Sequence, residues 1–172
     1  MGYLDPMPDT QLRTDFIHAM SRAAATVSVV STDGKGGRAG LTVSAMTSVS
    51  ADGDTPTILV CINQGAFAAA PILENGCFVV NVLKQGQQDI ADVFASRVNA
   101  PGGDKFEAGA WTTLATGAPV LDALASFDCD VQSAELVGTH HVIIGSVRAV
   151  RVSEEGAPLI YGMRSYLRAH PA

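Results

Sequence analysis

The sequence contains no apolar run long enough to cross a membrane. Its longest apolar runs, such as Ile58–Ile62 and Cys77–Val80, are short, whereas a transmembrane helix needs about 20 apolar residues in succession. The amino-terminal residues also lack the basic segment and the apolar stretch that make up a secretory signal. We therefore expect a cytoplasmic protein with no membrane partner.

The sequence is also poor in basic residues. It has 11 lysine and arginine residues against 17 aspartate and glutamate residues, which gives a formal net charge of −6 at pH 7. The basic residues are scattered along the chain and form no cluster. Because a nucleic-acid-binding surface normally requires such a cluster, we expect no nucleic-acid partner.

Only three cysteines are present, Cys61, Cys77 and Cys129, and no two of them form a C-x-x-C pair. Their odd number and wide spacing predict neither a zinc site nor a disulfide framework. His140 and His141 cannot both bind one metal ion, because adjacent side chains in a strand point to opposite faces. We expect buried, reduced thiols and no metal.

Apolar residues, in contrast, are abundant and make up 47% of the 172 residues. A chain of this length suits one domain with a sizeable core. We expect a single domain over residues 1–172, with residues 1–10 flexible. Because no membrane segment accounts for the apolar surplus, we expect part of it to lie in an interface between subunits.

A glycine-rich stretch, Gly34–Ala39, matches the G-x-G-x-x-A pattern of a dinucleotide-binding turn. That turn requires a helix directly after the glycines, yet the following residues, Leu41–Ser50, are rich in Thr, Val and Ser and favour a strand. The pair Asp33-Gly34 between two strand-like runs is a good hairpin signal. The sequence therefore predicts a hairpin here and no dinucleotide turn.

The remaining pattern is mostly strands separated by turns. We predict strands at 26–32, 39–45, 46–50, 57–63, 77–83, 126–137, 142–153 and 158–161. We predict short helices at 11–25, 66–74 and 87–97, the second ended by Asn75-Gly76 in a left-handed conformation, and a turn or helix at 118–124. Strands 57–63 and 77–83 are apolar enough to be buried on both faces. Because strands and long helices do not alternate, an antiparallel barrel with peripheral helices fits best.

An ordered set of segments resembles a known family, although no single motif in it is specific. The segments are Gly40–Ser50, Leu59–Asn63, Phe78–Leu83, Phe94–Arg97, Ser126–Cys129, Val137–His141, Pro158–Tyr161 and Arg164–Tyr166. Together they resemble the short-chain flavin reductases that supply reduced flavin to two-component monooxygenases. The resemblance runs from about Phe16 to Tyr166.

This resemblance implies a mainly β fold, the flavin-binding split β-barrel, which is a Greek-key antiparallel barrel with short peripheral helices. It implies a homodimer with the flavin near the subunit interface, FMN or FAD as the flavin, and NADH or NADPH as the hydride donor. It also implies a partner, a flavin-dependent monooxygenase that is served by diffusing reduced flavin.

The resemblance further implies cofactor contacts along the first segment, at Thr42, Val43, Ser44, Ala45, Ser48, Val49 and Ser50. Hydroxyl groups and free backbone N–H groups at a strand break can bind the edge of an isoalloxazine ring and a phosphate tail. The alternative is a solvated edge strand. Asn63 is expected beside the phosphate tail and Asn81 below the ring, although either asparagine could instead end its strand by bonding to local backbone.

Later segments add five expected contacts and two expected catalytic residues. Phe94, Ser96 and Arg97 end the third predicted helix, where Arg97 could bind a phosphate or favour the helix C-terminus. The resemblance places Arg164 and Tyr166 in a tail over the nicotinamide side of the flavin; the alternative is an ordinary basic terminus.

His140 and His141 match a G-x-H element of the family. The resemblance implies that one of them contacts the nicotinamide or stabilises charge on the reduced ring. We expect Trp111 to pack beside Phe106 instead of stacking on the flavin.

The function that these features predict is NAD(P)H:flavin oxidoreductase. Hydride transfer from nicotinamide to flavin needs no protein nucleophile or strong base, because the cofactor carries the chemistry. That agrees with the lack of a catalytic triad or carboxylate pair in the sequence. The alternatives are a non-enzymatic flavin- or haem-binding split barrel and a pyridoxamine-phosphate-oxidase-like barrel, the latter disfavoured because no Lys/Arg cluster for a second phosphate is apparent.

Overall fold

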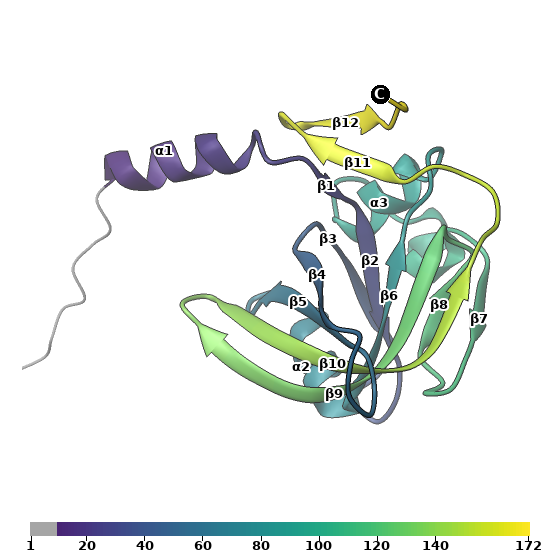
Figure 1. Cartoon of the computed structure of the whole chain (residues 1–172). Helices are drawn as coiled ribbons and strands as arrows, with labels where there is room; N and C mark the ends of the chain where they lie inside the picture. Colours follow the sequence, from purple (N-terminus) through teal and green to yellow (C-terminus); the bar gives the residue numbers. More distant parts are fainter. Residues whose placement is uncertain (1–9) are drawn as a thin grey trace, which may run out of the picture.

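The computed structural model describes residues 10–172 (Figure 1). The expectation that residues 1–10 are flexible therefore lies, except for Thr10, outside the described residues. The helices are α1 Thr10–Met20, α2 Ala69–Asn75 and α3 Gln88–Phe94, with short 3-10 helices η1 Pro101–Gly103 and η2 Lys105–Glu107. The strands are β1 Ala25–Thr26, β2 Ser28–Thr32, β3 Ala39–Val43, β4 Met46–Ser50, β5 Thr57–Asn63, β6 Cys77–Val82, β7 Trp111–Thr113, β8 Pro119–Leu121, β9 Ala125–Val137, β10 His140–Val152, β11 Leu159–Gly162 and β12 Ser165–Arg168.

Seven antiparallel strands form the main sheet, in the order β3-β2-β6-β9-β10-β5-β4. Its two edge strands, β3 and β4, are joined by only two residues, Ser44 and Ala45. Such a link spans about 11 Å at most, whereas a flat seven-stranded sheet is about 29 Å wide. The sheet must therefore curl until its edges meet.

The closure is incomplete, and this leaves a gap in the barrel. In the part of the chain that the structure describes, no ladder of hydrogen bonds joins β3 to β4. The carbonyl of Ala45 accepts a hydrogen bond from the backbone N–H of Cys61 at 3.1 Å, which ties the link to β5. The link is thus bonded to β5, while the space between β3 and β4 stays unpaired.

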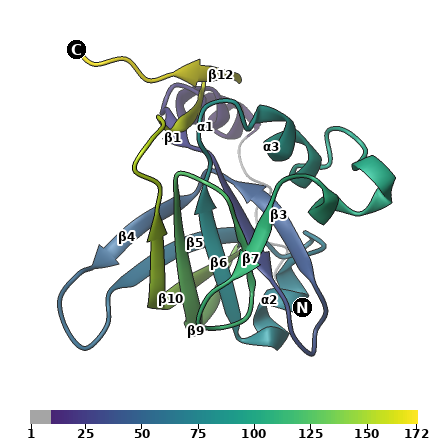
Figure 2. The same ribbon diagram turned by 90° about the vertical axis from the view of Figure 1, so that its right-hand side faces the viewer.

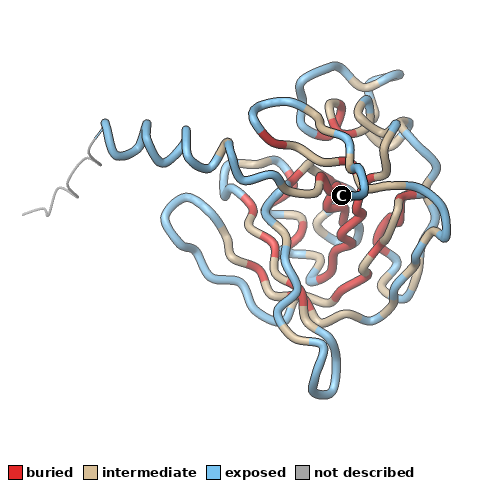
Figure 3. Tube along the Cα trace, turned by 45° about the horizontal axis from the view of Figure 1, so that its top comes forward, coloured by how far each residue is buried: buried red, intermediate tan, exposed pale blue. Residues whose placement is uncertain are grey.

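The core has two main parts, separated by the sheet. Inside the barrel, apolar side chains such as Val60, Phe78 and Ile143 are completely buried. A second cluster, which includes Val29, Phe94 and Leu121, lies on the other side of the sheet. Figure 3 shows the buried segments gathered within the body of the molecule. Strand β6 lies between apolar clusters and is buried along its whole length, as predicted from its apolar sequence.

One glycine is required by the packing of the barrel interior. A Cβ atom on Gly145 would lie 2.5 Å from the Phe78 ring and 2.9 Å from the Cβ of Cys129. Strand β10 also shifts its register against β9 between Ile144 and Gly145. The two long strands can therefore bend around the Phe78 ring only because residue 145 lacks a side chain.

Smaller elements gather at one end of the barrel. Strands β1, β11 and β12 form a three-stranded sheet, which lies at the same end as α3, while α2 lies at the opposite end (Figures 1 and 2). Helix α1 projects away from the barrel, and none of its residues is buried. Within residues 10–172, no helix has the length and apolar character needed to cross a membrane.

Several predicted elements are confirmed. The glycine-rich stretch turns the chain between β2 and β3, which pair antiparallel with Ser28 opposite Val43. Strands β4 and β5 have the predicted bounds. Helix α2 is followed by Gly76 with φ of 68°, and the Gly76 N–H donates to the Ile72 carbonyl.

Other predictions were wrong. Residues 118–124 are not a turn or helix: Pro119–Leu121 pair with Trp111–Thr113 and are fully buried. The expected tail at 164–166 includes the start of β12, which pairs with β11. Helix α1 ends at Met20, before the predicted Ala25. Strand β5 is buried on alternate residues only, because its second face is covered only in part.

Candidate functional site

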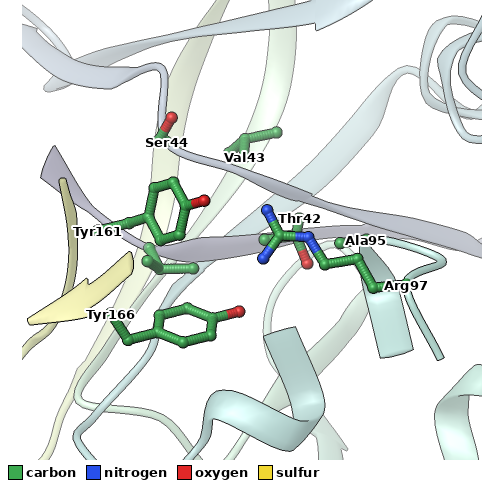
Figure 4. A pocket seen from close by; sticks show the side chains of 8 residues that line it. Thr42, Val43, Ser44, Ala95, Arg97, Tyr161 and Tyr166 are labelled. Atoms are coloured by element: carbon green, nitrogen blue, oxygen red, sulfur yellow. The ribbon is translucent and has the colours of Figure 1, made fainter. Parts of the chain in front are cut away.

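A cavity of about 150 Å³ opens beside the link between the barrel edges. It is lined by Val27, Thr42, Val43, Ser44, Ala95, Arg97, Tyr161 and Tyr166. Figure 4 shows the two tyrosine rings together on one side, with the Arg97 guanidinium reaching toward them from the other. We call this the first cavity. One wall is aromatic and apolar, Thr42 and Ser44 carry hydroxyl groups, and Arg97 supplies a positive charge.

The end of α3 positions Ser96 and Arg97. The Ser96 N–H donates to the Val93 carbonyl at 3.0 Å, and the Arg97 N–H donates to the Asp92 carbonyl at 2.9 Å. These two bonds form a Schellman motif, which requires a left-handed residue after the helix and usually has glycine there. Ser96 takes that conformation with φ of 57°. The strained turn directs the Arg97 side chain back to the cavity.

Asp92, in the last turn of α3, connects Arg97 with Tyr166. Its Oδ1 accepts a hydrogen bond from the Tyr166 hydroxyl at 2.6 Å and lies 3.3 Å from Arg97 Nη1. Burial, followed by the bond to Asp92, raises the pKa of Tyr166 to about 12. The phenol is therefore protonated at neutral pH and acts as a hydrogen-bond donor.

The aromatic wall is built by a β-hairpin. Tyr161 on β11 lies opposite Tyr166 on β12, with ring centroids 5.4 Å apart in an edge-on arrangement. The Arg97 guanidinium lies 5.3 Å from the centre of the Tyr161 ring, within the range of a cation–π contact. On the facing wall, the Thr42 hydroxyl donates to the Ala91 carbonyl at 2.7 Å and so ties β3 to α3.

A second cavity, of about 210 Å³, adjoins the first and shares Thr42 and Ala95 with it. Its other lining residues are Gly40, Leu41, Ala66, Phe67, Ala68, Phe94, Ser96 and Lys105. Lys105 Nζ donates to Ser96 Oγ at 2.8 Å, and burial lowers the pKa of Lys105. Among residues 10–172, no carboxylate forms an ion pair with this ammonium group. The second cavity is therefore suited to an anion.

The structure brings together seven of the residues predicted from sequence. Thr42, Val43, Ser44, Arg97 and Tyr166 line the first cavity, and Phe94 and Ser96 line the second. Phe94 belongs mainly to the core, because it is 1% exposed and packs against Phe106 and Trp111 at 5.2 and 5.5 Å. Trp111 packs beside Phe106 at 4.8 Å, as predicted.

Asn81 is not part of either cavity. It is completely buried, and its amide nitrogen donates to the Val29 carbonyl and to Ser31 Oγ. Its carbonyl oxygen accepts from the Leu121 N–H and from Ser126 Oγ. All its polar capacity is used inside the protein by residues that are distant in sequence, so Asn81 packs in the core and does not bond local backbone as the alternative supposed.

The residues predicted along β4 also lie outside both cavities. Ser48 and Val49 are exposed on an edge strand, and Ser50 Oγ accepts a hydrogen bond from the Asp52 N–H at 3.1 Å. Ala45 belongs to the link but does not line the first cavity. Of the predicted contacts between Thr42 and Ser50, only Thr42, Val43 and Ser44 therefore line the first cavity in a single chain.

His140, His141 and Asn63 lie at the same end of the main sheet as the link. His140 pairs with Asn63 and His141 with Ile62. Since β5 separates β10 from the link, the histidine backbone is about 10 Å from it. The two side chains point to opposite faces, and neither histidine nor Asn63 lines the cavities.

Arg164 lies apart from the other predicted residues. It is at the turn between β11 and β12 with φ of 61°, and it lines a separate cavity with His18, Ser21 and Arg22 near the end of α1. This placement gives no support to a contact between Arg164 and a ligand in the first cavity.

Sequence reasoning missed Tyr161 and Lys105. Tyr161 had a possible signal, because a hairpin centred on Met163 and Arg164 would have placed it opposite Tyr166. Lys105 had none, because it begins the short 3-10 helix η2 and reaches Ser96 only through the folded chain.

Comparison with known proteins identifies the family. The model of the flavin reductase-like domain matches residues 20–170. The chain belongs to this family. The match confirms the resemblance read from the sequence, and the fold is the mainly β split barrel of flavin reductases, as predicted.

Individual relatives cover most of the chain. It is 46% identical over 149 residues to a protein of Methylorubrum populi named FMN reductase (NADH) RutF, covering 86% of this chain and 72% of that one. It is 40% identical to FMN reductase (NADH) RutF 2 of Rhizobium rhizogenes, covering 94% and 91%. Among solved structures, flavin reductase PheA2 in its native state has a TM-score of 0.82 and 30% identity over 95% of this chain and 99% of its own.

The strained turn at Ser96 generates a prediction. Replacing Ser96 with glycine should leave the thermal unfolding temperature unchanged or raise it, because a left-handed conformation costs an L-residue about 1–2 kcal/mol, partly offset by glycine's larger backbone entropy loss. The same change removes the hydroxyl that holds Lys105, so we expect weaker binding of FMN. Calorimetry and an FMN titration measure the two effects. A drop in unfolding temperature would contradict the strain assigned to Ser96. Unchanged FMN affinity would contradict a role for its hydroxyl in holding Lys105 at the ligand site.

Proposed function

We propose that the protein is an NADH-dependent flavin reductase that supplies reduced flavin to a partner oxygenase. The observation that carries the proposal is the pair of joined cavities at the barrel gap, one aromatic with a cation and the other suited to an anion, in a member of the flavin reductase-like family. Relatives at 40–46% identity are named as NADH-dependent FMN reductases. A structure with 30% identity and a TM-score of 0.80 is BorF, the flavin reductase component of a two-component tryptophan halogenase.

The cavities fit a flavin in shape and chemistry. Each is smaller than the roughly 300–1,000 Å³ of usual ligand pockets, but they adjoin at Thr42 and Ala95. The aromatic first cavity suits a flat ring, and Lys105 with Ser96 in the second suits a phosphate. Arg97 lies in the wall of the first cavity, near the second.

The mechanism divides the work between ligand and protein. When bound, a flavin supplies the redox chemistry, because its ring accepts hydride from the nicotinamide of NADH. Tyr161 and Tyr166 exclude water from one side of the cavity, which strengthens electrostatic interactions inside it. Arg97, oriented by Asp92, offers a fixed positive charge to the negative charge that develops during reduction.

The alternative of a non-enzymatic flavin- or haem-binding barrel is less well supported. The relatives that cover most of this chain are named reductases.

Flavin-dependent oxidation of NADH under air tests the proposal. The protein should oxidise NADH only when FMN or FAD is added. Arg97→Gln should weaken flavin binding about ten- to a hundredfold, the usual value of a hydrogen bond to a charged group. Arg148→Gln is the matched control, because Arg148 is an exposed residue paired with Asp130 on the long hairpin strands. No flavin-dependent oxidation by the unmodified protein would refute the function; equal behaviour of the two variants would remove Arg97 from the site.

We propose further that the protein is a homodimer and that the second copy completes the flavin site. The first cavity is too small to bury a flavin ring in one chain. The predicted contacts that lie outside it, including Ser48, Val49 and His140, are exposed. A second chain packed on this side could bring such residues to the ligand of its neighbour.

Helix α1 supports this dimer. Its side chains Leu12, Phe16, Ile17 and Met20 are 41–68% exposed, although Leu12, Phe16 and Met20 form a continuous apolar stripe at helical spacing. A projecting helix with an uncovered apolar stripe is rare in a monomer, because burial of that surface stabilises association.

Light scattering tests the dimer, for which we expect a particle of twice the 17.8 kDa of one chain. Phe16→Glu should shift the equilibrium toward monomer and weaken FMN binding together, because a charge in the stripe opposes burial. Thr14→Glu adds the same charge on the other side of α1 and should do neither. A monomeric unmodified protein, or a Phe16→Glu variant that stays dimeric, would contradict the proposal.

We also infer a cytoplasmic location, supported by the cysteines. Cys77 and Cys129 are buried and free, as is usual in a reducing compartment. Burial raises the pKa of Cys129 to about 12, so its thiol is poorly reactive.

A further inference from the structure

A third cavity, of about 310 Å³, continues from the second and is not needed for a flavin mononucleotide. Its lining residues are Arg38, Ala39, Gly40, Phe67, Gly103, Asp104, Lys105 and Phe106. Gly40, Phe67 and Lys105 belong to both the second and the third cavity. The three cavities therefore form a series in which Lys105 lies at the last boundary.

The third cavity has an aromatic side chain that the core does not use. Phe67 is 86% exposed, the highest value among the large apolar side chains of residues 10–172. Phe67 follows β5 and precedes α2. Its ring contacts no other aromatic ring among residues 10–172. An exposed phenyl group at the mouth of a cavity is suited to stack on a nucleobase.

The cavity also offers positive charge. The Arg38 guanidinium lies 4.7 Å from the centre of the Phe106 ring and pairs with Asp104 at 2.5 Å. Both charged side chains are nearly half exposed, at 48% and 44%, so the pair is worth little and can exchange for another partner. Arg38 and Lys105 together give the third cavity two cations.

We propose that the third cavity binds the adenosine phosphate half of a dinucleotide whose reacting ring lies in or against the first cavity. The inference rests on the proposed function. The three cavities offer, in order, an aromatic site for a ring, a cation for a phosphate, and an exposed aromatic side chain for a base. The isoalloxazine ring, the phosphates and the adenine of FAD follow one another in the same order. NADH contains the same adenosine phosphate group and is the other possible source, which the experiment below separates from FAD.

Phe67→Ala is the principal test, because the side chain is exposed and its loss should not affect folding. Titrations with FAD and with FMN are compared in the unmodified protein and the variant. We expect the Kd for FAD to rise at least about fivefold, the lower end for loss of a base–aromatic stack, and to rise by a larger factor than the Kd for FMN, because Phe67 also lines the second cavity. Val152→Ala, at a 67% exposed residue at the end of β10, is the control.

Asp104→Asn gives an independent test of opposite sign. Asparagine can still accept the Phe106 N–H, as Asp104 Oδ1 does at 3.0 Å, but it frees Arg38 from its carboxylate partner. We expect FAD to bind more tightly and FMN to be little affected, because a negative charge near the phosphates is removed.

The source of the nucleotide follows from steady-state kinetics with saturating FMN. If the third cavity serves FAD, Phe67→Ala leaves the KM for NADH unchanged. If it serves NADH, the KM for NADH rises.

The inference is overturned if Phe67→Ala alters neither FAD binding nor the KM for NADH, or if it weakens FMN and FAD equally. It is also overturned if light scattering shows that the variant loses its oligomeric state, since Phe67 would then be an interface residue. Oxidation of NADH with FMN by the unmodified protein tests the proposed function separately, so the two failures can be distinguished.

Discussion

The two-residue link between β3 and β4 is the constraint on which the rest of the structure depends. Because Ser44 and Ala45 join opposite edges of a seven-stranded sheet, the sheet must close on itself, and its interior fills with apolar side chains. Closure is nevertheless incomplete, because in the described part of the chain no ladder of hydrogen bonds joins β3 to β4. The gap that remains is where the cavities lie.

The elements around the gap are adapted to hold a ligand at some cost in local stability. Ser96 takes a conformation that favours glycine, and Lys105 is partly buried with no carboxylate partner in the described chain. The conformation of Ser96 costs stability whether or not a ligand is bound, whereas the partly buried charge of Lys105 would be stabilised by an anionic group bound beside it. Such local conflicts with folding rules are expected at functional sites.

The sequence predicts the parts that depend on local pattern. Strands Met46–Ser50 and Thr57–Asn63 follow from their β-branched residues and flanking loops, and the end of α2 follows from Gly76. The short strand Pro119–Leu121 could not be predicted, because it exists only through pairing with Trp111–Thr113. Local pattern is sufficient where a segment carries its own signal and insufficient where a distant partner decides.

The two asparagines show the same limit within the candidate site. Asn63 and Asn81 each occur near the end of an apolar strand, so pattern alone could not separate them. Residues far away in sequence, Leu121 and Ser126 among them, use the polar groups of Asn81 inside the core. Asn63, in contrast, is exposed, and its side chain accepts a hydrogen bond from the nearby Gly65 N–H. Likewise Lys105 joins Ser96 only through the fold.

Hydrogen–deuterium exchange with and without saturating FMN tests the central claim, that the gap at the β3–β4 link is the flavin site. The account predicts slower exchange of backbone amides at residues 42–46 and 95–105 when FMN is present, because ligand binding restrains these segments. The hairpin turn at residues 33–38 should be unaffected by FMN. If FMN slows exchange at that turn or at other segments but leaves residues 42–46 unchanged, the account is contradicted.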